Sequence, residues 1–241
     1  MIPRVLVVGA PGKMGRLAVE TIAEAPDFEL AGTAGRGEDL LALLDEVQPQ
    51  IWIDMTTPEV GGDHLDLAVE RGIHPVFGTT GIDRERLARA GGVAEERSLG
   101  GVIAPNFSLG ACLLMELSEM VARQLPEVEI IEAHHPQKKD APSGTSLRTR
   151  DRLLQNREGA AAAPESIPIH SVRLPGFLAT QEVIFGGTGE RLILRHETLD
   201  RRCFAAGILL ACRRVSALPG LIFDLAPLLF GDSDRSLGRT R

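Results

Sequence analysis

The sequence contains little lysine, few aromatic residues and few cysteines. Only Lys13, Lys138 and Lys139 are lysines among 26 basic residues, tyrosine is absent, and aromatic residues make up 4% of the 241 residues. The three cysteines lie in apolar stretches with neither a CxxC pair nor a metal-binding spacing, so we expect reduced, buried thiols. The formal net charge of −7 argues against nucleic acid or a membrane surface as the main partner, because both attract a basic face.

Long hydrophobic runs are also missing. No apolar run reaches about 18 residues, the length that a membrane-spanning helix needs. Residues 1–8 lack the basic start, the full apolar core and the small-residue cleavage site of a secretory signal. Together with the cysteine usage, these absences predict a cytoplasmic protein.

The first part of the chain alternates between strand-like and helix-like segments. A short apolar run over residues 4–8 ends at Gly9 and is typical of a strand buried on both faces of a parallel sheet. The further predicted strands are 28–34, 50–55, 75–78 and 101–104, and the predicted helices are 14–25, 39–47, 62–71 and 84–96. This alternation predicts an open, doubly wound α/β domain of the Rossmann type.

The pattern changes after Asn106 and predicts a separate α+β unit. A longer amphipathic helix over 108–124 leads to a strand over 128–132 and to a helix that begins near Ser143. Two strand-like runs, 181–185 and 191–196, flank a glycine-rich turn and indicate an antiparallel hairpin. An apolar helix over 203–215 could return to pack on the first domain. Residues 159–164 are the only compositionally biased stretch.

A glycine-rich turn follows the first predicted strand. The run Gly9-Ala10-Pro11-Gly12-Lys13-Met14-Gly15 places glycines three residues apart and opens a helix. Small residues allow the backbone to approach a pyrophosphate, which then binds free N–H groups at the positive end of the helix dipole. We therefore predict that all seven residues bind a dinucleotide. The alternative is a merely tight turn.

The residue that usually selects NAD is missing from the end of the second strand. Gly35 stands where an acidic residue normally binds the ribose 2′-hydroxyl, and Arg36 follows it. Arg36 can pair with a 2′-phosphate, and Lys13 could add a second contact. We predict that NADPH is accepted at least as well as NADH, with Glu38 or Asp39 as a substitute acid. The alternative is that Arg36 is an ordinary surface arginine.

Two more loops follow predicted strands of the first domain. Ligands of open α/β sheets bind at the carboxyl ends of the strands, so both loops are candidates for contacts to nicotinamide and ribose. The predicted cofactor-binding residues here are Gly78, Thr79, Thr80, Ala104, Pro105, Asn106 and Phe107. Ordinary turn chemistry is the alternative for each loop.

The densest group of chemically active residues spans 132–145. It contains two of the six histidines and two of the three lysines, directly after a strand and before a helix whose N-cap is Ser143 or Thr145. A helix N-terminus, a lysine and two imidazoles can bind carboxylates and supply a proton near neutral pH. His134 and His135 point apart on a strand and no third ligand is near, so we expect no metal site. The alternative is a set of solvated surface residues.

These stretches resemble the 4-hydroxy-tetrahydrodipicolinate reductase (dihydrodipicolinate reductase) family. The matching motifs run in family order along nearly the whole chain: 9–15, 78–81, 104–108, 132–135 with 138 and 140–145, 171–173, His196 with Arg201 and Phe204, and 219–221. The resemblance implies an enzyme of the diaminopimelate route to lysine. It would use NADPH or NADH to reduce a cyclic unsaturated dicarboxylate, and no metal.

The resemblance also implies individual roles. His134 matches the general acid, Lys138 the lysine that assists it and holds a carboxylate, and the substrate-binding positions match His135, Ser143, Gly144 and Thr145. It implies a dinucleotide-binding domain over 1–106 and 201–241. A substrate-binding and tetramerisation domain with a mixed open sheet would span 107–200, with 106–108 as the hinge and a homotetramer as the assembly.

The sequence departs from the family pattern at several places. Gly35 replaces the usual acid, and the segment 36–50 is short. Leu174-Pro175 stands where many members carry glycines, and Thr180 stands where histidine is common. Two other functions remain open at this point: another nicotinamide-dependent oxidoreductase of an amino or oxo acid, and a nucleotide-sensing module without turnover.

Overall fold

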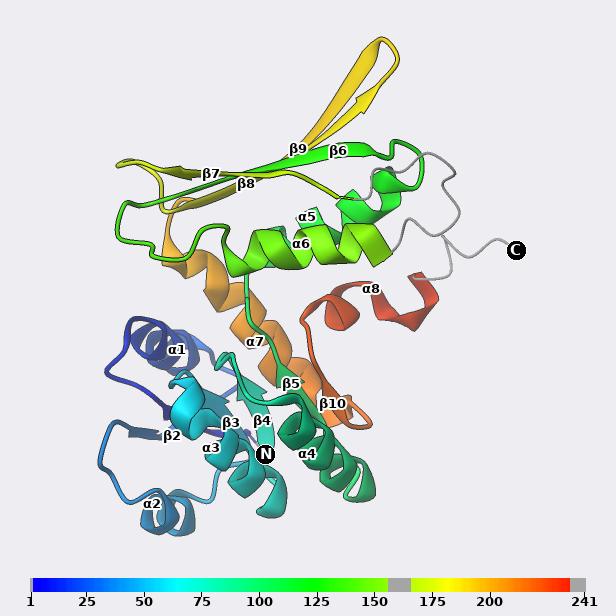
Figure 1. Ribbon diagram of the computed structural model, residues 1–241. Coiled ribbons are helices and arrows are strands. Elements are labelled where there is room, and N and C mark those ends of the chain that lie inside the picture. The colour runs from blue at the N-terminus through cyan, green and yellow to red at the C-terminus, as the bar shows by residue number, and fades with distance from the viewer. Residues whose placement is uncertain (1, 156–165, 235–241) are drawn as a thin grey trace. The chain divides into compact units, whose positions relative to one another are not determined.

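The computed structural model describes residues 2–155 and 166–234 and divides into two compact units (Figure 1). The first unit comprises Met1–Ser108 and Phe204–Asp234, and the second comprises Leu109–Cys203. The compositionally biased stretch 159–164 lies outside the described residues. None of the helices in the described ranges is long and apolar enough to cross a bilayer.

The first unit is built on a six-stranded parallel sheet in the order β10-β5-β4-β3-β1-β2. The strands are β1 (Arg4–Val8), β2 (Glu29–Ala34), β3 (Ile51–Asp54), β4 (His74–Phe77), β5 (Gly101–Ile103) and β10 (Leu221–Ile222). The sheet order reverses at β1, which lies between β2 and β3. In sheets of this kind the ligand binds at the carboxyl ends of the strands beside such a reversal. The predicted Rossmann-type α/β domain is confirmed.

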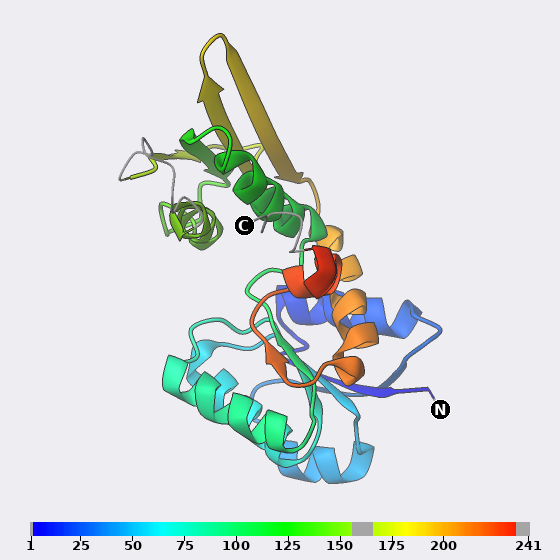
Figure 2. The same ribbon diagram turned by 90° about the vertical axis from the view of Figure 1, so that its right-hand side faces the viewer.

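Helices cover both faces of this sheet (Figure 2). They are α1 (Lys13–Glu24), α2 (Leu40–Val47), α3 (Pro58–Glu70), α4 (Arg84–Glu96), α7 (Ala205–Arg214) and α8 (Ala226–Asp234), with a 3-10 turn η2 (Val215–Ala217) after α7. One face packs on α2, α3 and α4 through buried Leu6, Trp52, Leu65 and Phe77. On the other face α7 contacts α1 and β4. The C-terminal helix α7 thus packs on elements of the first unit.

Local capping fixes where these helices begin. Asp39 Oδ1 accepts hydrogen bonds from the backbone N–H of Leu41 and Ala42, both at 3.1 Å. Asp83 caps α4 in the same way through Glu85 and Arg86. Such caps satisfy N–H groups that have no partner within the helix.

The second unit is a four-stranded mixed sheet in the order β7-β6-β8-β9. Strand β6 (Glu127–His134) is parallel to β7 (Ile169–Arg173) and antiparallel to β8 (Ala179–Gly187), which forms a hairpin with β9 (Glu190–Thr198). Helices α5 (Leu109–Ala122) and α6 (Gly144–Gln155) lie together along one side of the sheet (Figure 1), and a 3-10 turn η1 (Arg201–Phe204) follows β9. The core includes Leu114, Ile130, Leu153, Val183 and Phe185. The hairpin and the mixed sheet were predicted, whereas β7 was not.

Candidate active site

The glycine loop fits closely against the ends of its neighbouring strands. Gly9 has a φ of +86°, and a Cβ atom there would lie 2.7 Å from the carbonyl carbon of Met55. The backbone N–H groups of Gly9 and Ala10 both donate to the Ala34 carbonyl, at 2.9 and 3.0 Å. These contacts to Met55 and Ala34 hold the loop between the ends of β3 and β2. They leave no room for a side chain at position 9, where only glycine fits.

The start of α1 offers the features that bind a pyrophosphate. Its N-cap is Gly12, which has no side chain to occupy the first N–H groups of the helix. A Cβ atom at Gly15 would lie 1.9 Å from the Gly9 carbonyl oxygen, so the loop and the helix pack backbone against backbone. Lys13 and Arg16 add positive charge in the first turn. This cradle of backbone and cations suits a dinucleotide.

Gly35, which follows β2, lies close to the glycine loop. A Cβ atom at Gly35 would lie 3.0 Å from Pro11 Cγ and 3.8 Å from Glu38 Oε1. A side chain at this position would therefore press on the glycine loop, and the carboxylate of Glu38 occupies its neighbourhood instead. Asp39 is used as the N-cap of α2. Arg36 is exposed.

The predicted cofactor loops meet at one edge of the sheet. Backbone hydrogen bonds of 2.8–2.9 Å link the residue after each strand to its neighbouring strand: Met55 to Val8, Gly78 to Asp54, and Ala104 to Phe77. Thr80 and Pro105 are exposed there, whereas Thr79, Ala104 and Phe107 are buried. Asn106 is half-buried, and its Oδ1 accepts a hydrogen bond from the Ser108 N–H at 2.8 Å.

A buried carboxylate that the sequence did not single out lies beneath these loops. Asp54, at the end of β3, has no exposed surface. Its Oδ1 accepts from the hydroxyl of Thr56 at 2.5 Å and from that of Thr79 at 2.6 Å, and its Oδ2 lies 2.7 Å from His64 Nδ1. We call Asp54, Thr56, His64 and Thr79 the Asp54 cluster. It connects the loops after β3 and β4 to α3.

The second unit holds a second buried carboxylate, Glu132, next to the predicted acid. Glu132 has no exposed surface, and its Oε2 lies 2.6 Å from His134 Nδ1. The guanidinium of Arg173 donates to both carboxylate oxygens at 2.7 and 2.8 Å, and the Ser143 N–H donates at 3.2 Å. We call these four residues the Glu132 cluster. β6 supplies two of them, β7 supplies one, and Ser143 directly precedes α6.

Burial and charge act in opposite directions on this cluster. Burial alone would raise the pKa of Glu132, but hydrogen bonds from Arg173, Ser171 and His134 hold it below its usual value. Burial lowers the pKa of His134, the Glu132 carboxylate opposes this, and Lys138 and Arg173 lower it further. In this structure the neutral form of His134 is therefore favoured more than in a free histidine.

The other predicted residues lie in the loop between β6 and α6. Lys138 Nζ forms a 2.9 Å ion pair with Asp140, and this hydrogen bond lowers the pKa of Asp140. The Asp140 carbonyl accepts from Arg173 at 2.7 Å, so the loop is tied to β7. His135 Nδ1 pairs with Gln137 at 3.1 Å. Arg173 therefore links the loop that carries Lys138 to Glu132, the partner of His134.

The hydrogen bonds at the start of α6 decide between the two predicted N-cap residues, Ser143 and Thr145. Ser143 Oγ accepts from the Ser146 N–H at 3.2 Å and is buried, so Ser143 is the N-cap. Its backbone, rather than its hydroxyl, faces the Glu132 carboxylate. Gly144 is exposed, with open space where a Cβ atom would be, and Thr145 is half-buried. An anion can therefore reach the first turn of α6 at these two residues.

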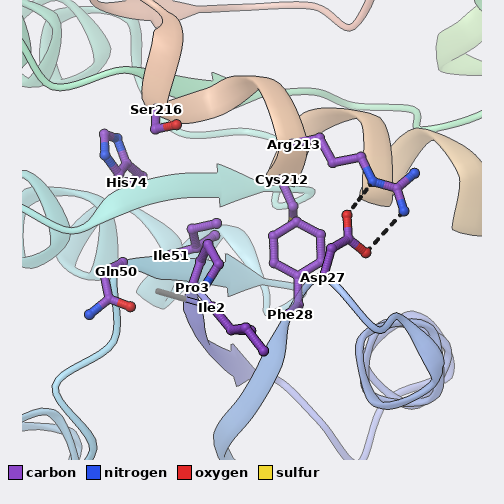
Figure 3. A pocket seen from close by; sticks show the side chains of 10 residues that line it. All are labelled: Ile2, Pro3, Asp27, Phe28, Gln50, Ile51, His74, Cys212, Arg213 and Ser216. Atoms are coloured by element: carbon purple, nitrogen blue, oxygen red, sulfur yellow. Dashed lines mark hydrogen bonds and ion pairs between the residues drawn. The ribbon is translucent and has the colours of Figure 1, made fainter.

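A cavity of about 430 Å³ lies elsewhere in the first unit (Figure 3). Its lining includes Pro3, Phe28, Gln50 and His74, which lie at the amino ends of β1, β2, β3 and β4. Asp27 and Arg213 pair across its side at 2.7 and 3.1 Å. The cavity is at the opposite end of the strands from the glycine loop, so it is separate from the cofactor site. Within the described ranges, no group of three His, Cys, Asp or Glu side chains could hold a metal ion.

Comparisons with known proteins give a consistent result over the whole chain. The family model "Dihydrodipicolinate reductase, N-terminus" matches residues 3–107, and "Dihydrodipicolinate reductase, C-terminus" matches residues 110–229. A 4-hydroxy-tetrahydrodipicolinate reductase of Geobacillus thermodenitrificans is 42% identical over 264 residues, covering 95% of this chain and 100% of the relative. One of Coxiella burnetii is 40% identical over 239 residues, covering 95% and 100%. The dipicolinate-bound dihydrodipicolinate reductase of Paenisporosarcina sp. TG-14 superposes with a TM-score of 0.85 at 34% identity, covering 94% and 99%.

The glycine loop and the parallel sheet form a Rossmann-type dinucleotide-binding domain, and the named relatives make the chain an oxidoreductase with a nicotinamide cofactor. Both family models and the curated relatives carry the assignment further. The chain belongs to the dihydrodipicolinate reductase family.

Proposed function

We propose that the protein reduces 4-hydroxy-tetrahydrodipicolinate to tetrahydrodipicolinate with NADPH or NADH, as a step of lysine biosynthesis. The observation that carries this proposal is that His134 and the start of α6 meet at the buried Glu132 carboxylate, with Lys138 in the loop between them. A proton donor, a cation and free N–H groups suit a cyclic dicarboxylate. The relatives at 40–42% identity are named for the same reaction.

The residues of the chain bind the substrate and donate a proton to it. Loss of the 4-hydroxyl group as water gives the unsaturated dihydrodipicolinate ring, and the nicotinamide, when bound, would supply a hydride to one carbon of its double bond. The electron pair of the attacked double bond moves to the neighbouring ring carbon, which takes a proton from His134. Lys138 holds one carboxylate and stabilises the developing negative charge. His135, Gly144 and Thr145 bind the other carboxylate, with Ser143 fixing the start of the helix.

Turnover with freshly generated 4-hydroxy-tetrahydrodipicolinate tests the proposal. We expect oxidation of the reduced cofactor that depends on substrate. His170 is an exposed residue of β7 and provides a matched control: His170→Ala is expected to keep full turnover, whereas His134→Ala loses most of it. Tight cofactor binding without any oxidation would instead indicate a nucleotide-sensing module. Wild-type turnover of His134→Ala would remove the role given to His134.

The arrangement at the end of β2 supports use of both cofactors, with NADPH accepted at least as well as NADH. Arg36 is the group for a 2′-phosphate, with Lys13 as a second cation, and Glu38 is the acid for a free 2′-hydroxyl. Arg36→Ala is expected to lower kcat/KM for NADPH by about tenfold or more, with little effect on NADH. Glu38→Gln is expected to lower kcat/KM for NADH. Arg89→Ala on α4 is the control, and a strong NADH preference unchanged by Arg36→Ala contradicts this assignment.

We also propose a homotetramer formed through the sheet of the second unit. Strand β9 exposes Leu192 and Ile193, at 40% and 42%. On the adjoining strand Glu182 pairs with Arg195 across the surface. Light scattering is expected to give a mass of four chains, and Ile193→Glu is expected to yield smaller species.

The free state of the cysteines Cys112, Cys203 and Cys212 supports a cytoplasmic location.

A further inference from the structure

We propose that Glu132 is the positioning residue for the acid His134: it holds the Nδ1 proton, so that Nε2 is the atom that delivers a proton to the substrate. Arg173 keeps Glu132 ionised throughout. This inference rests on the role proposed for His134 and adds which nitrogen acts and what fixes it.

The contacts of Glu132 determine which nitrogen carries the fixed proton. An ionised carboxylate can only accept hydrogen bonds. Its two oxygens accept from both terminal nitrogens of Arg173 at 2.7 and 2.8 Å and from the Ser143 N–H at 3.2 Å. His134 Nδ1, at 2.6 Å from Oε2, must therefore be the donor in that contact. This leaves Nε2 as the exchangeable position.

The charges around His134 explain how it can lose a proton in a partly buried place. The groups that face it are Glu132 on β6, Arg173 on β7, and the ion pair of Lys138 with Asp140 in the loop before α6. Arg173 balances Glu132 whether or not His134 is charged. Release of a proton from His134 therefore leaves no buried carboxylate without a cation.

The proton step then needs no rearrangement within the imidazole. The bond from Nε2 to its proton breaks as the proton binds the ring carbon, and the bond at Nδ1 stays intact. The imidazolium becomes the neutral Nδ1–H tautomer, which is the form that already donates to Glu132. Solvent returns the proton to Nε2 for the next cycle. Preorganisation of this kind avoids movement during the reaction.

The first test uses the wild-type protein without substrate or cofactor. Nitrogen NMR of histidine-labelled protein, with the His134 signal identified by its loss in His134→Gln, reports the tautomer directly. We expect the neutral ring to carry its proton on Nδ1. A neutral ring protonated on Nε2 would overturn the proposal. This readout does not depend on turnover, so it stands apart from any failure of the proposed function.

The second test is Glu132→Gln, with Glu129→Gln as its matched control. Glu129 lies on the same strand but is exposed, and it also binds a histidine, with its Oε2 at 2.7 Å from His170 Nε2. We expect Glu132→Gln to lower kcat by roughly 10- to 100-fold, a share of what acid catalysis contributes. The alkaline limb of kcat/KM is expected to move to lower pH, because the carboxylate that supports the charged imidazole is gone.

Three comparisons complete the second test. Glu129→Gln is expected to leave both values unchanged. Glu132→Asp keeps the charge and is expected to return the alkaline limb toward the wild-type pH. A folded Glu132→Gln protein with the wild-type pH profile would overturn the proposal, since a merely structural role would not move that profile. Should Glu132→Gln fail to fold, the NMR result on the wild-type protein decides.

Discussion

Each unit contains one carboxylate with no exposed surface that binds the Nδ1 of a histidine. Asp54 does so in the first unit and Glu132 in the second, at 2.7 and 2.6 Å. The remaining partners differ. Glu132 binds a guanidinium through both oxygens, whereas Asp54 is met by hydroxyls and a backbone N–H.

This difference supports the proton-transfer role proposed for the Glu132 cluster and suggests a supporting role for the Asp54 cluster. In the Glu132 cluster the arginine carries the balancing charge, so the imidazole is free to change its protonation. Among the described contacts of Asp54, His64 is the one group able to carry positive charge. Both hydroxyl protons of the Asp54 cluster are directed at the carboxylate, so Thr56 and Thr79 are fixed in orientation. We therefore expect the Asp54 cluster to hold the cofactor loops in place.

Replacing each histidine in turn tests this comparison, and it is the test for which we expect the largest change in activity. His134→Gln is expected to lower kcat by about 10²–10⁴-fold, the usual contribution of an acid, with cofactor affinity unchanged. His64→Gln is expected to act mainly on the dissociation constant and KM of the cofactor. Steady-state kinetics and cofactor fluorescence titration measure both. Equal losses of kcat in the two variants would contradict the different roles proposed for the Glu132 cluster and the Asp54 cluster.

Asp54→Asn is expected to have the next largest effect. It replaces an acceptor of several hydrogen bonds, so it lowers the free energy of unfolding by about 1–3 kcal/mol and weakens cofactor binding. Denaturant unfolding and titration with NADPH measure the two effects. Asp45→Asn is the control, because Asp45 pairs with Arg71 at the surface and is 67% exposed. An unchanged cofactor affinity would contradict the scaffold role.

The pH dependence should reveal the Glu132 cluster without any substitution. Burial lowers the pKa of His134, so the acid form of the free protein is lost as pH rises through a value below the usual pKa of histidine. The alkaline limb of kcat/KM is expected to begin there. The limb of kcat is expected at higher pH, because a bound dianion favours the charged imidazole. Coincident limbs would contradict this expectation.

Asp140→Asn is expected to give the smallest change. Asp140 pairs with Lys138 but is more than half exposed, at 57%. Its removal frees Lys138 and takes a negative charge from the proposed binding site for the dicarboxylate. KM for the substrate is expected to fall by a few-fold at most, as for an exposed ion pair. The effect is expected to fade at high salt. A large loss of kcat would instead place Asp140 within the machinery of the reaction.

Local patterns in the sequence predicted most elements, because each buried strand or amphipathic helix leaves a periodic signal. Strand β7 left no such signal. Its sequence Ile-His-Ser-Val-Arg alternates poorly, and two of its five residues are exposed at the edge of the sheet. It is a strand because β6 pairs with it and because Arg173 reaches Glu132.

The two carboxylates show what the sequence could not supply. The most distant partners of Glu132 and Asp54 are Arg173 and Thr79, 41 and 25 residues away, so no local spacing links these two pairs. A clue was present in β6, where Val128, Ile130 and Glu132 alternate on the buried side. An acid at a core-facing position needs a partner. The sequence motif placed His134 and Lys138, but the contacts that tune His134 required the fold.

The return of α7 and β10 to the first unit has a consequence for biosynthesis. β10 adds the last strand to the sheet beside β5, and α7 packs on α1, yet both follow the whole second unit in the chain. The first unit cannot complete its sheet until Ile222 has left the ribosome. The second unit comes from the continuous stretch Leu109–Cys203 and can fold as soon as that stretch emerges. The second unit can therefore complete its sheet before the first unit does, although the first unit begins earlier in the chain.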